Sequence, residues 1–345
     1  MRSGGLVRSR RRTLALTLGL AVGCGGGGGG GPDGGGSDAP TGDAGVVCGA
    51  ADPRTGPVQL EIGPGGWDAW TDLIDGATTS LDLQMYLFTV NQVEAAVIDA
   101  HQRGVAVRVL LDPDHAGNLN TRGDLEDAGV EVRDAPSRFE FSHAKYAIID
   151  GDTAMILSGN FNVDAYSQER NYGVSLTDPD DLEDLQALFD ADWTGAPEPD
   201  LGCTKLVVSP SNGRSRIIAH IRGAQTRLDI EVSYLSDSAV RTSVVEAKNR
   251  GVAVRVILAS PEDYEANAAA IQILQNQSIP VRIASGFLLH AKLLLADDAA
   301  LIGSHNYSTT SMNDNREVGV VVTTPAVISA IEAQFATDWA ASTAP

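Results

Sequence analysis

The sequence predicts an α/β fold that is built from two copies of one unit. The first observation behind this prediction is an internal repeat, because the heptapeptide Arg103–Val109 returns unchanged as Arg250–Val256, 147 residues later. The second is the alternation, within each copy, of strand-like apolar runs and helix-like stretches, which is typical of a mixed or parallel sheet covered on both faces. We therefore expect two α/β/α units, residues 55–197 and 203–342, related by a pseudo-twofold axis with a ligand-binding seam between them.

The first unit shows the expected elements in a clear order. They are a strand, a helix, a strand, a helix, a strand, a hairpin-like pair of strands, a strand and a closing helix: Val58–Ile62, Trp67–Ile74, Leu81–Phe88, Val93–Arg103, Val105–Leu111, Ala144–Asp150 with Ala154–Leu157, Tyr172–Leu176 and Asp181–Trp193. Gly104 follows the second helix directly, in the usual position of a glycine at a helix end. The closing helix repeats as well, because Phe189, Asp192 and Trp193 return as Phe335, Asp338 and Trp339.

The N-terminal segment carries signals for export rather than for folding. Several arginines precede the apolar run Thr13–Gly23, which is too short to span a bilayer and is typical of a signal-peptide core, so we expect residues 1–23 to be removed. Ala21–Cys24 resembles a bacterial lipoprotein box, which predicts lipidation of Cys24; the alternative is ordinary signal-peptidase cleavage. The glycine-rich residues 24–54 predict a flexible tether. We expect a protein of the bacterial cell envelope, either in the periplasm or anchored to the membrane by a lipid.

Two further cysteines, Cys48 and Cys203, each lie a few residues before the start of one copy. In an oxidising compartment an even number of cysteines favours a disulfide, here one that would join the two copies. The alternative is a pair of small unpaired thiols.

The composition is that of a globular protein, with 43% apolar and 20% charged residues, but it is strongly acidic. The 45 acidic residues outnumber the 25 basic ones, and loss of residues 1–23 with their five arginines changes the formal charge from −20 to −25. Binding along a nucleic-acid backbone needs clustered lysines and arginines, so the composition disfavours that class of function.

The same group of polar residues occurs once in each copy. His143 and Lys145 return as His290 and Lys292, and residues two apart on a strand project from the same face. Each pair is followed by an aspartate, a serine and an asparagine at matching distances: Asp150, Ser158 and Asn160, then Asp297, Ser304 and Asn306. An imidazole beside an ammonium group suits attack on a phosphoryl group and neutralisation of its charge, while serine and asparagine can donate hydrogen bonds to its oxygens.

This pattern resembles the phospholipase D superfamily, the phosphodiesterases with two His-x-Lys-x₄-Asp motifs, over nearly all of the expected mature domain. The resemblance implies that both motifs meet at one central site that needs no cofactor and no metal. One histidine attacks phosphorus to form a phosphohistidine, and the other protonates the leaving alcohol and then activates water or an acceptor alcohol. Similarity to many members makes His143 the nucleophile and His290 the acid and base, although the sequence alone leaves the reverse open.

The resemblance also implies roles for the remaining motif residues. It assigns the phosphoryl oxygens to four side chains with two serines in support: Lys145, Lys292, Asn160 and Asn306, with Ser158 and Ser304. Asp150 and Asp297 complete the two catalytic motifs, and we expect them to hold an imidazole or the adjoining loop rather than to transfer protons. No group of histidines and cysteines has the spacing of a zinc site, and the pair Asp112 and Asp114 is a weak metal candidate.

Two features, at Leu157 and Asn171, depart from the family pattern. Leu157 stands where the family usually has a glycine, which predicts a tighter or shifted first phosphate loop. Glu317 resembles the glutamate that orients a catalytic histidine, but the first copy has Asn171 at that place, so we expect a different orienting group there. His305 lies inside the second Ser-x-Asn loop, which predicts a position near the site without a role.

The expected substrate is a phospholipid. Export to a membrane and strong acidity favour a phospholipase D that hydrolyses glycerophospholipids to phosphatidate and the head-group alcohol, with nucleic acid the less favoured partner, and we expect a monomer. The apolar residues before the motifs, Phe139, Phe141 and Phe287–Leu289, could meet acyl chains, but their pattern favours core packing. The alternatives are an exported endonuclease of the same superfamily and a catalytically silent binding module of the envelope.

Overall fold

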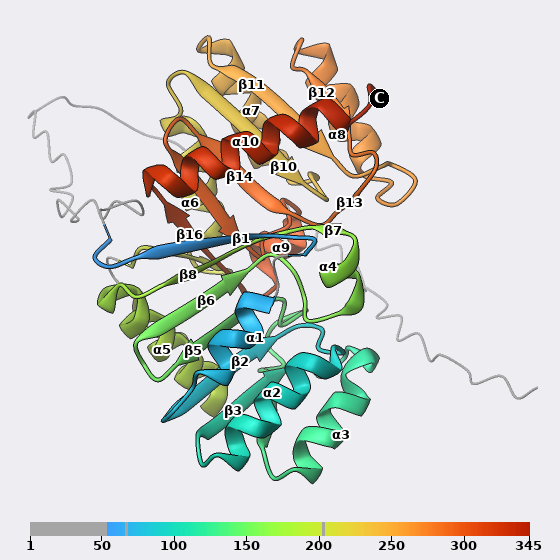
Figure 1. The fold of residues 1–345 in the computed structure, drawn as a ribbon. Helices are drawn as coiled ribbons and strands as arrows, with labels where there is room; N and C mark the ends of the chain where they lie inside the picture. Colours follow the sequence, from blue (N-terminus) through green and yellow to red (C-terminus); the bar gives the residue numbers. More distant parts are fainter. Residues whose placement is uncertain (1–53, 66–67, 202–203) are drawn as a thin grey trace, which may run out of the picture. The chain divides into compact units, whose positions relative to one another are not determined.

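A computed structural model describes residues 54–65, 68–201 and 204–345 (Figure 1). The expected signal peptide, most of the expected tether, and Cys24, Cys48 and Cys203 lie outside these residues. Within the described part of the chain, no helix combines the length and the apolar character needed to cross a membrane.

Each half contains one seven-stranded mixed sheet, and the two sheets have the same strand order. In the first half the order is β1-β8-β6-β5-β2-β3-β4, with β2, β3 and β4 parallel and the other neighbours antiparallel. The strand bounds are β1 Val58–Ile62, β2 Ser80–Met85, β3 Ala106–Leu111, β4 Glu131–Asp134, β5 Lys145–Ile149, β6 Thr153–Leu157 and β8 Tyr172–Leu176. The two-strand pair expected after the third strand is therefore confirmed as the antiparallel hairpin β5–β6.

The second sheet repeats this topology as β9-β16-β15-β14-β10-β11-β12. Its strands are β9 Leu206–Ser209, β10 Arg227–Val232, β11 Ala253–Leu258, β12 Val281–Ile283, β14 Lys292–Ala296, β15 Ala299–Gly303 and β16 Glu317–Val322. A third, two-stranded sheet joins the halves, because β13 (Leu288–Leu289) runs parallel to β7 (Glu169–Arg170). The predicted fold of two related α/β units with mixed sheets is thus confirmed.

Helices cover both faces of each sheet. On the outer face of the first sheet lie α1 and α2, with α3 beside them, and on the outer face of the second lie α6, α7 and α8. The long helices α5 and α10 cover the inner faces. The bounds are α1 Asp68–Asp75, α2 Asn91–Gln102, η1 Ala116–Asn118, α3 Leu119–Asp127, α4 Val163–Ser167, α5 Pro179–Thr194, α6 Gly213–Gly223, α7 Ser238–Asn249, α8 Asn267–Asn276, α9 Thr309–Asn313 and α10 Pro325–Ala341.

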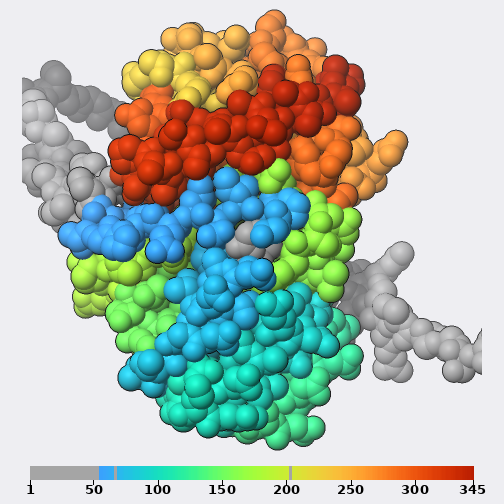
Figure 2. Space-filling model, in the orientation of Figure 1, coloured from blue at the N-terminus to red at the C-terminus, as the bar shows by residue number. Residues whose placement is uncertain are grey.

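The largest buried cluster belongs to both halves at once. It joins apolar side chains of β5, β6, β8 and α5 to those of β14, β15, β16 and α10, so the expected seam is a shared core. β1 also contacts α10 across the boundary, and Figure 2 shows these two segments side by side at the surface. Burial of apolar surface is the main force that holds the halves together.

Two ion pairs also join the halves at this contact, and each links an arginine of one half to an aspartate of the other. Arg170, which precedes Asn171, binds Asp338 on α10 with Nε–Oδ2 2.7 Å, and Arg316, which precedes Glu317, binds Asp192 on α5 with Nε–Oδ2 2.8 Å. Arg316 and both aspartates are almost completely buried. A buried guanidinium with a bidentate carboxylate fixes position strongly, because either partner left alone would be an uncompensated charge. Each half thereby fixes the segment of the other half that enters the site.

Candidate active site

Both His-x-Lys motifs lie at the start of a central strand, β5 in the first half and β14 in the second. The segments before them pair with the opposite half. Ser142 forms a parallel bridge with Arg316, and the His290 N–H donates to the Arg170 carbonyl at 3.1 Å. The structure therefore brings His143, Lys145, His290 and Lys292 to one place between the halves. The charge of each lysine lowers the pKa of the histidine in the other half.

A carboxylate of the second half holds the first histidine. The Nδ1 atom of His143 lies 2.8 Å from Oε2 of Glu317, which is fully buried. The hydroxyl of Ser311 and the amide of Asn315 donate to the other carboxylate oxygen at 2.7 and 3.0 Å. Burial raises the pKa of Glu317, but the charge and hydrogen bond of His143 outweigh it and lower that pKa to about 2. A carboxylate can only accept, so Nδ1 of His143 carries the proton and Nε2 is left as a lone pair.

An amide of the first half holds the second histidine. The Nδ1 atom of His290 lies 3.2 Å from Oδ1 of Asn171 and 3.3 Å from Oε2 of Glu169. The Asn171 amide donates to the same Glu169 oxygen at 2.9 Å. The different orienting group expected in the first copy is thus an amide backed by Glu169, whose pKa burial raises. The orienting groups are crossed, since each half supplies the one that faces the histidine of the other.

The pKa of both imidazoles lies below the usual value for histidine. Burial is the largest influence on His143, followed by the opposing charge of Glu317 and then by Lys145, and the resulting pKa is about 4. Burial, Lys292, Lys145 and His143 all lower the pKa of His290. A neutral imidazole with its Nδ1 proton bound and its Nε2 free is the nucleophilic form.

The two lysines are buried, and they lie close enough together for the charge of Lys145 to act on Lys292. Nζ of Lys145 donates to the His143 carbonyl at 2.6 Å and lies 5.1 Å from the centre of the Tyr86 ring, while Lys292 donates to the His290 carbonyl. Burial lowers the pKa of Lys145 to about 7, against the opposing charge of Glu317, and that of Lys292 falls as well. An ammonium group has three donors, so two on each lysine remain for an anion.

The two asparagines of the motif are placed differently. Asn160 is buried, and its Oδ1 has no hydrogen-bond partner among the described residues. Oδ1 of Asn306 accepts from the hydroxyl of Ser233 at 3.0 Å. Asn160 is therefore one of the buried polar side chains of the motif loops with unused hydrogen-bonding capacity, as is His305.

Ser158 and Ser304 point to protein groups rather than to a phosphate site. Ser158 donates to Oδ1 of Asn171 at 2.9 Å and accepts from the backbone of Tyr172, and Ser304 bonds both backbone groups of Val318. Both serines are fully buried. Their hydrogen bonds tie the Ser-x-Asn loops to β8 and β16, so the structure assigns them a positioning role in place of phosphate binding.

Asp150 and Asp297 lie at the far ends of β5 and β14 from the histidines. Each lies five positions after its lysine, about 16 Å along the strand at the usual rise. Asp150 accepts from the backbone N–H groups of Thr78, Thr79 and Ser80, and Asp297 binds the matching residues 225–227. These bonds keep the pKa of both aspartates low although burial raises it. Of the two roles left open by the sequence, the structure therefore shows the one on the adjoining loop.

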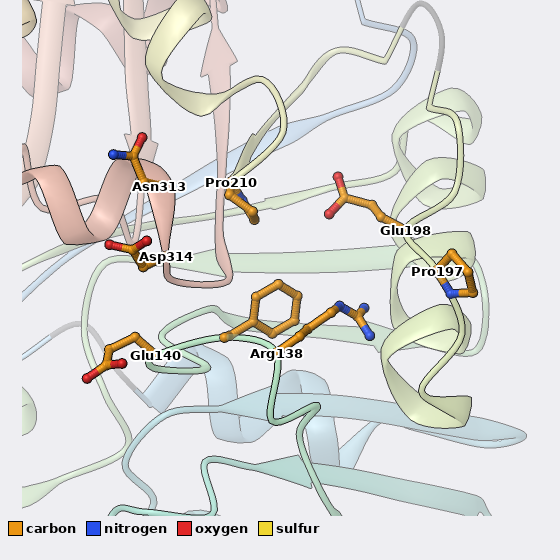
Figure 3. Close-up of a pocket in the computed structure, with 8 residues that line it drawn as sticks. Arg138, Glu140, Pro197, Glu198, Pro210, Asn313 and Asp314 are labelled. Atoms are coloured by element: carbon orange, nitrogen blue, oxygen red, sulfur yellow. The ribbon is translucent and has the colours of Figure 1, made fainter. Parts of the chain in front are cut away.

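Two pockets lie beside the segments that lead into the motifs. One, of about 430 Å³, is lined by Arg138, Phe139, Glu140, Pro197, Glu198, Pro210, Asn313 and Asp314. Figure 3 shows Asn313 and Asp314 on one side of it and Pro197 and Glu198 on the other. The other, of about 560 Å³, is lined by Pro64, Ser167, Gln168, Arg170, Gly286, Phe287 and Leu288. The repeat relates the two pockets, but the first has several ionisable side chains and the second has Arg170 alone.

A family model described as "Cardiolipin synthase, PLD-like domain" matches the chain twice, over residues 70–193 and 217–339. The two matches follow the internal repeat and cover well over half of the chain. The chain belongs to this family. It is a member of the phospholipase D superfamily, as the paired motifs indicated.

Two relatives illustrate the match. Cardiolipin synthase A of Pseudomonas fluorescens is 27% identical over 325 residues, which cover 81% of this chain and 67% of that protein. The mitochondrial cardiolipin hydrolase of Chlamydomonas reinhardtii is 30% identical over 133 residues, or 38% of this chain and 58% of that protein. The chain thus spans about half to two thirds of the length of the curated relatives it matches.

Solved structures share the fold. The phosphatidylserine synthase of Haemophilus influenzae superimposes with a TM-score of 0.64 at 14% identity, covering 83% of this chain and 87% of that one. A polyphosphate kinase from Porphyromonas gingivalis gives a TM-score of 0.65 at 19% identity, covering 81% of this chain and 46% of that one.

The departure from the phospholipase D pattern at Leu157 does not move the first loop. The Ser158 N–H donates to the Tyr172 carbonyl at 2.9 Å, as that of Ser304 does to Val318 at 3.0 Å. Leu157 is buried above Gly173, where a Cβ atom would lie 2.6 Å from the leucine side chain and equally close to Trp70. Gly173 corresponds to Gly319, so the first copy keeps the glycine of the partner strand and has Leu157 where the second has Gly303. The Ser158 hydrogen bond keeps its register, so the expected shift of the loop is wrong.

Some residues at the site escaped the sequence reasoning. The Tyr86 ring packs against His143 with centres 4.7 Å apart, and Ser233 takes its place in the second copy, so the repeat gave no signal for it. Glu169 was assigned no role. His305, by contrast, was expected near the site, and it lies close enough for the charges of Glu317 and His143 to shift its pKa, which burial lowers to about 4. Phe141 and Leu288, expected in the core, are 37% and 48% exposed.

Among the residues that the structure describes, no group of three or more histidine, cysteine, aspartate or glutamate side chains is arranged to hold a metal ion. Asp112, the weak metal candidate, accepts from the backbone N–H groups of Ser142 and Asp114 at 2.7 and 3.1 Å. It thereby fixes the residue before His143.

Proposed function

We propose that the chain is a phospholipase D-type enzyme that hydrolyses glycerophospholipids to phosphatidate and the head-group alcohol. The observation that carries the proposal is the crossed pair of imidazoles, one bound to a carboxylate and one to an amide, with two buried lysines beside them. Such a site is suited to a phosphodiester because the ammonium groups bind the anion and the imidazoles supply a nucleophile and a proton donor.

His143 is the better nucleophile of the two. As its Nε2 bonds to phosphorus, the ring becomes positively charged, and the Glu317 carboxylate stabilises this charge through Nδ1–H. The amide of Asn171 offers His290 less stabilisation, so His290 gives up a proton more readily. The first step forms the bond from Nε2 of His143 to phosphorus, breaks the bond to the leaving oxygen, and moves a proton from His290 to that oxygen.

Substrate binding raises the pKa of His290, so His290 takes up a proton from solvent before the first step. The two lysines lower its pKa while the site is empty, and the negative charge of the bound phosphodiester offsets them, which raises that pKa. In the second step neutral His290 takes a proton from water, the water oxygen bonds to phosphorus, and the bond to His143 breaks. Lys145, Lys292 and Asn160 hold the non-bridging oxygens throughout.

Lipid is favoured over nucleic acid by three points. The names of the relatives refer to cardiolipin, the overall charge is −20, and the N-terminal sequence predicts export. We extend the proposal to location: cleavage before Cys24 and lipidation would place the enzyme beside its substrate in the cell envelope. The mass of the purified mature N-terminus tests this, and an unlipidated residue 24 or an uncleaved signal would contradict it.

Transfer of the phosphatidyl group to an alcohol is the second candidate, because one of the two relatives described above is a cardiolipin synthase that matches over 81% of this chain. The same phosphohistidine serves both reactions, and only the acceptor differs.

The test uses the mature chain with Cys24→Ser, which removes any lipid. We expect choline release from phosphatidylcholine micelles in the presence of EDTA, and a new phosphatidyl ester when a primary alcohol is added. His143→Ala should abolish both. Cleavage of plasmid DNA without lipid turnover would overturn the proposal in favour of a nuclease, and inactivity on both substrates would favour a binding module.

A further inference from the structure

Exposed apolar side chains gather near the site, three on the first half and one on the second. Among the residues that the structure describes, five large apolar side chains are exposed. Four of them lie within three residues in sequence of a site residue or of a residue that contacts one. These four are Leu119, Phe141, Val163 and Leu288, and we call them the apolar arc. Their exposed fractions range from 37% to 68%. Isolated exposed side chains are normal in proteins, but a cluster at a functional site marks a contact surface.

The sheet topology places the arc residues of the first half at one edge. β2 is parallel to β3 and antiparallel to β5, which is antiparallel to β6. The ends of β2, β3 and β6 and the start of β5 therefore lie at the same edge, and the segments that carry Leu119, Phe141 and Val163 all emerge there. His143 and Lys145 lie at this edge as well.

Contacts of neighbouring residues connect the segments that carry these side chains into a path. Tyr86 packs against His143, Phe141 and His115, and His115 begins the short η1 turn that leads to Leu119. Asn118 accepts from the Phe88 N–H at 2.9 Å, and Phe88 forms a bridge with Phe161, two residues before Val163.

The same path continues into the second half. The Leu288 N–H donates to the carbonyl of Gln168, which directly follows α4, the helix that begins at Val163. The arc thus runs from Phe141 around the first histidine and its neighbours to Leu288, two residues before His290.

The second half lacks most of this feature. Asn267 repeats the hydrogen bonds of Asn118, so Ala268 corresponds to Leu119, and Thr309 corresponds to Val163 in the repeat. Both are exposed, as their counterparts are. The duplication therefore does not require apolar residues at these positions, and packing does not require them either.

We infer that the apolar arc inserts into the surface of a phospholipid layer and holds the site against it. The inference rests on the proposed function. A phospholipid fits this arrangement, because its phosphodiester can bind between the lysines while its apolar part lies against the arc. A nucleic-acid strand would need free cations at this place, but the neighbouring Arg122, Arg138 and Arg170 each bind a carboxylate. Contact through the arc is therefore apolar rather than electrostatic.

The test measures sedimentation with phosphatidylcholine vesicles, using the mature chain with Cys24→Ser and His143→Ala so that neither lipidation nor turnover contributes. The double substitution Leu119→Ser and Val163→Ser should lower the partition coefficient about tenfold, because two exposed apolar side chains lose their transfer free energy. Ile273→Ser removes the fifth exposed apolar side chain, on α8 away from the arc, and should leave the partition coefficient unchanged.

Two further measurements sharpen the test. The pair Ala268→Leu and Thr309→Val extends the arc into the second half and should raise the partition coefficient about threefold. Binding of the unaltered arc should change little between about 0.1 and about 0.5 M salt, because screening acts on charges and not on apolar contact.

Failure of the inference and failure of the proposed function give different results. Absence of vesicle binding, or binding that the double substitution leaves intact, overturns the inference, and so does a dimer in solution that the double substitution dissociates. Head-group release from micelles alongside either result leaves the enzyme proposal standing. Arc-dependent binding without head-group release by the chain that retains His143 overturns the enzyme proposal and supports the inference.

Discussion

The two halves of the molecule have nearly the same frame and different chemistry at their histidines. In both, an aspartate after the central strand fixes the adjoining loop, and an arginine binds the closing helix of the other half. At the site, however, His143 faces the buried carboxylate of Glu317, whereas His290 faces the amide of Asn171 with Glu169 behind it. The comparison shows that a duplicated frame can be kept while one change of carboxylate to amide gives its two histidines unequal tasks.

The largest effect is expected when each histidine is removed separately, which tests whether the two have different roles. On a phosphodiester with a nitrophenol leaving group, which departs without a proton, His290→Ala should release one equivalent per site in a burst and then stall. His143→Ala should show no burst and a loss of about 10⁴-fold in rate. Stopped-flow absorbance measures both. A burst in His143→Ala and none in His290→Ala would exchange the two roles.

The second prediction concerns the carboxylate. Glu317→Gln keeps a hydrogen bond to His143 but removes the charge that stabilises its cationic form, so kcat should fall at least about 100-fold. Glu317 raises the pKa of His143, so its loss should move the acid limb of kcat/KM, which we expect at about 4, to lower pH. The pH–rate profile measures this, with circular dichroism as the control for folding. An acid limb that moves to higher pH would contradict the assignment.

The third prediction concerns a substitution that gives both halves a carboxylate next to the histidine. Asn171→Asp places a second carboxylate against a histidine, which favours the protonated form of His290 and raises its pKa. Because His290 must be protonated when substrate is bound, the basic limb of kcat should move to higher pH by about one unit. Asn171→Ala serves as the control that removes the amide without adding charge. A limb that stays in place would show that Glu169 already sets the pKa of His290.

The smallest effect on activity is expected at Leu157. Leu157→Gly gives the first loop the glycine that the second has at Gly303, and since Ser158 is already in register, kcat should change by less than about threefold. Stability should fall by about 2–5 kcal/mol, because the leucine side chain fills the space above Gly173. Thermal unfolding alongside kinetics separates the two quantities. A large loss of activity at unchanged stability would mean that Leu157 shapes the site itself.

Much of this frame could be predicted from the sequence because it repeats. The heptapeptide of β3 and β11 and the two motifs gave the fold, the halves and the residues that meet at the site. α3 and β4 were missed, because Leu119–Asp127 has little apolar periodicity and a glycine in its interior, and β4 is a short edge strand that is mostly exposed.

The three-dimensional relations could not be predicted in the same way. The crossing of Glu317 to His143 depends on how the two sheets face each other, which no spacing records. The serines belong to a motif that suggests phosphate contact, yet whether a hydroxyl faces a ligand or the next strand is decided by one rotation of a side chain. The second copy has Ser233 in place of Tyr86, so the internal repeat carries no signal for this residue.

The crossed pairs Arg170–Asp338 and Arg316–Asp192 have a consequence for how such a chain can change over time. A single copy would have neither the orienting group for its histidine nor the acid for its arginine, so it could work only as a symmetric homodimer. Once two copies are fused, a substitution no longer appears twice in the same site. The two copies differ at equivalent positions, with Asn171 for Glu317, Ser233 for Tyr86 and Thr309 for Val163. The identical chains of a homodimer could not carry such differences. In a fused chain, a single point mutation can therefore give the two histidines of one site different roles.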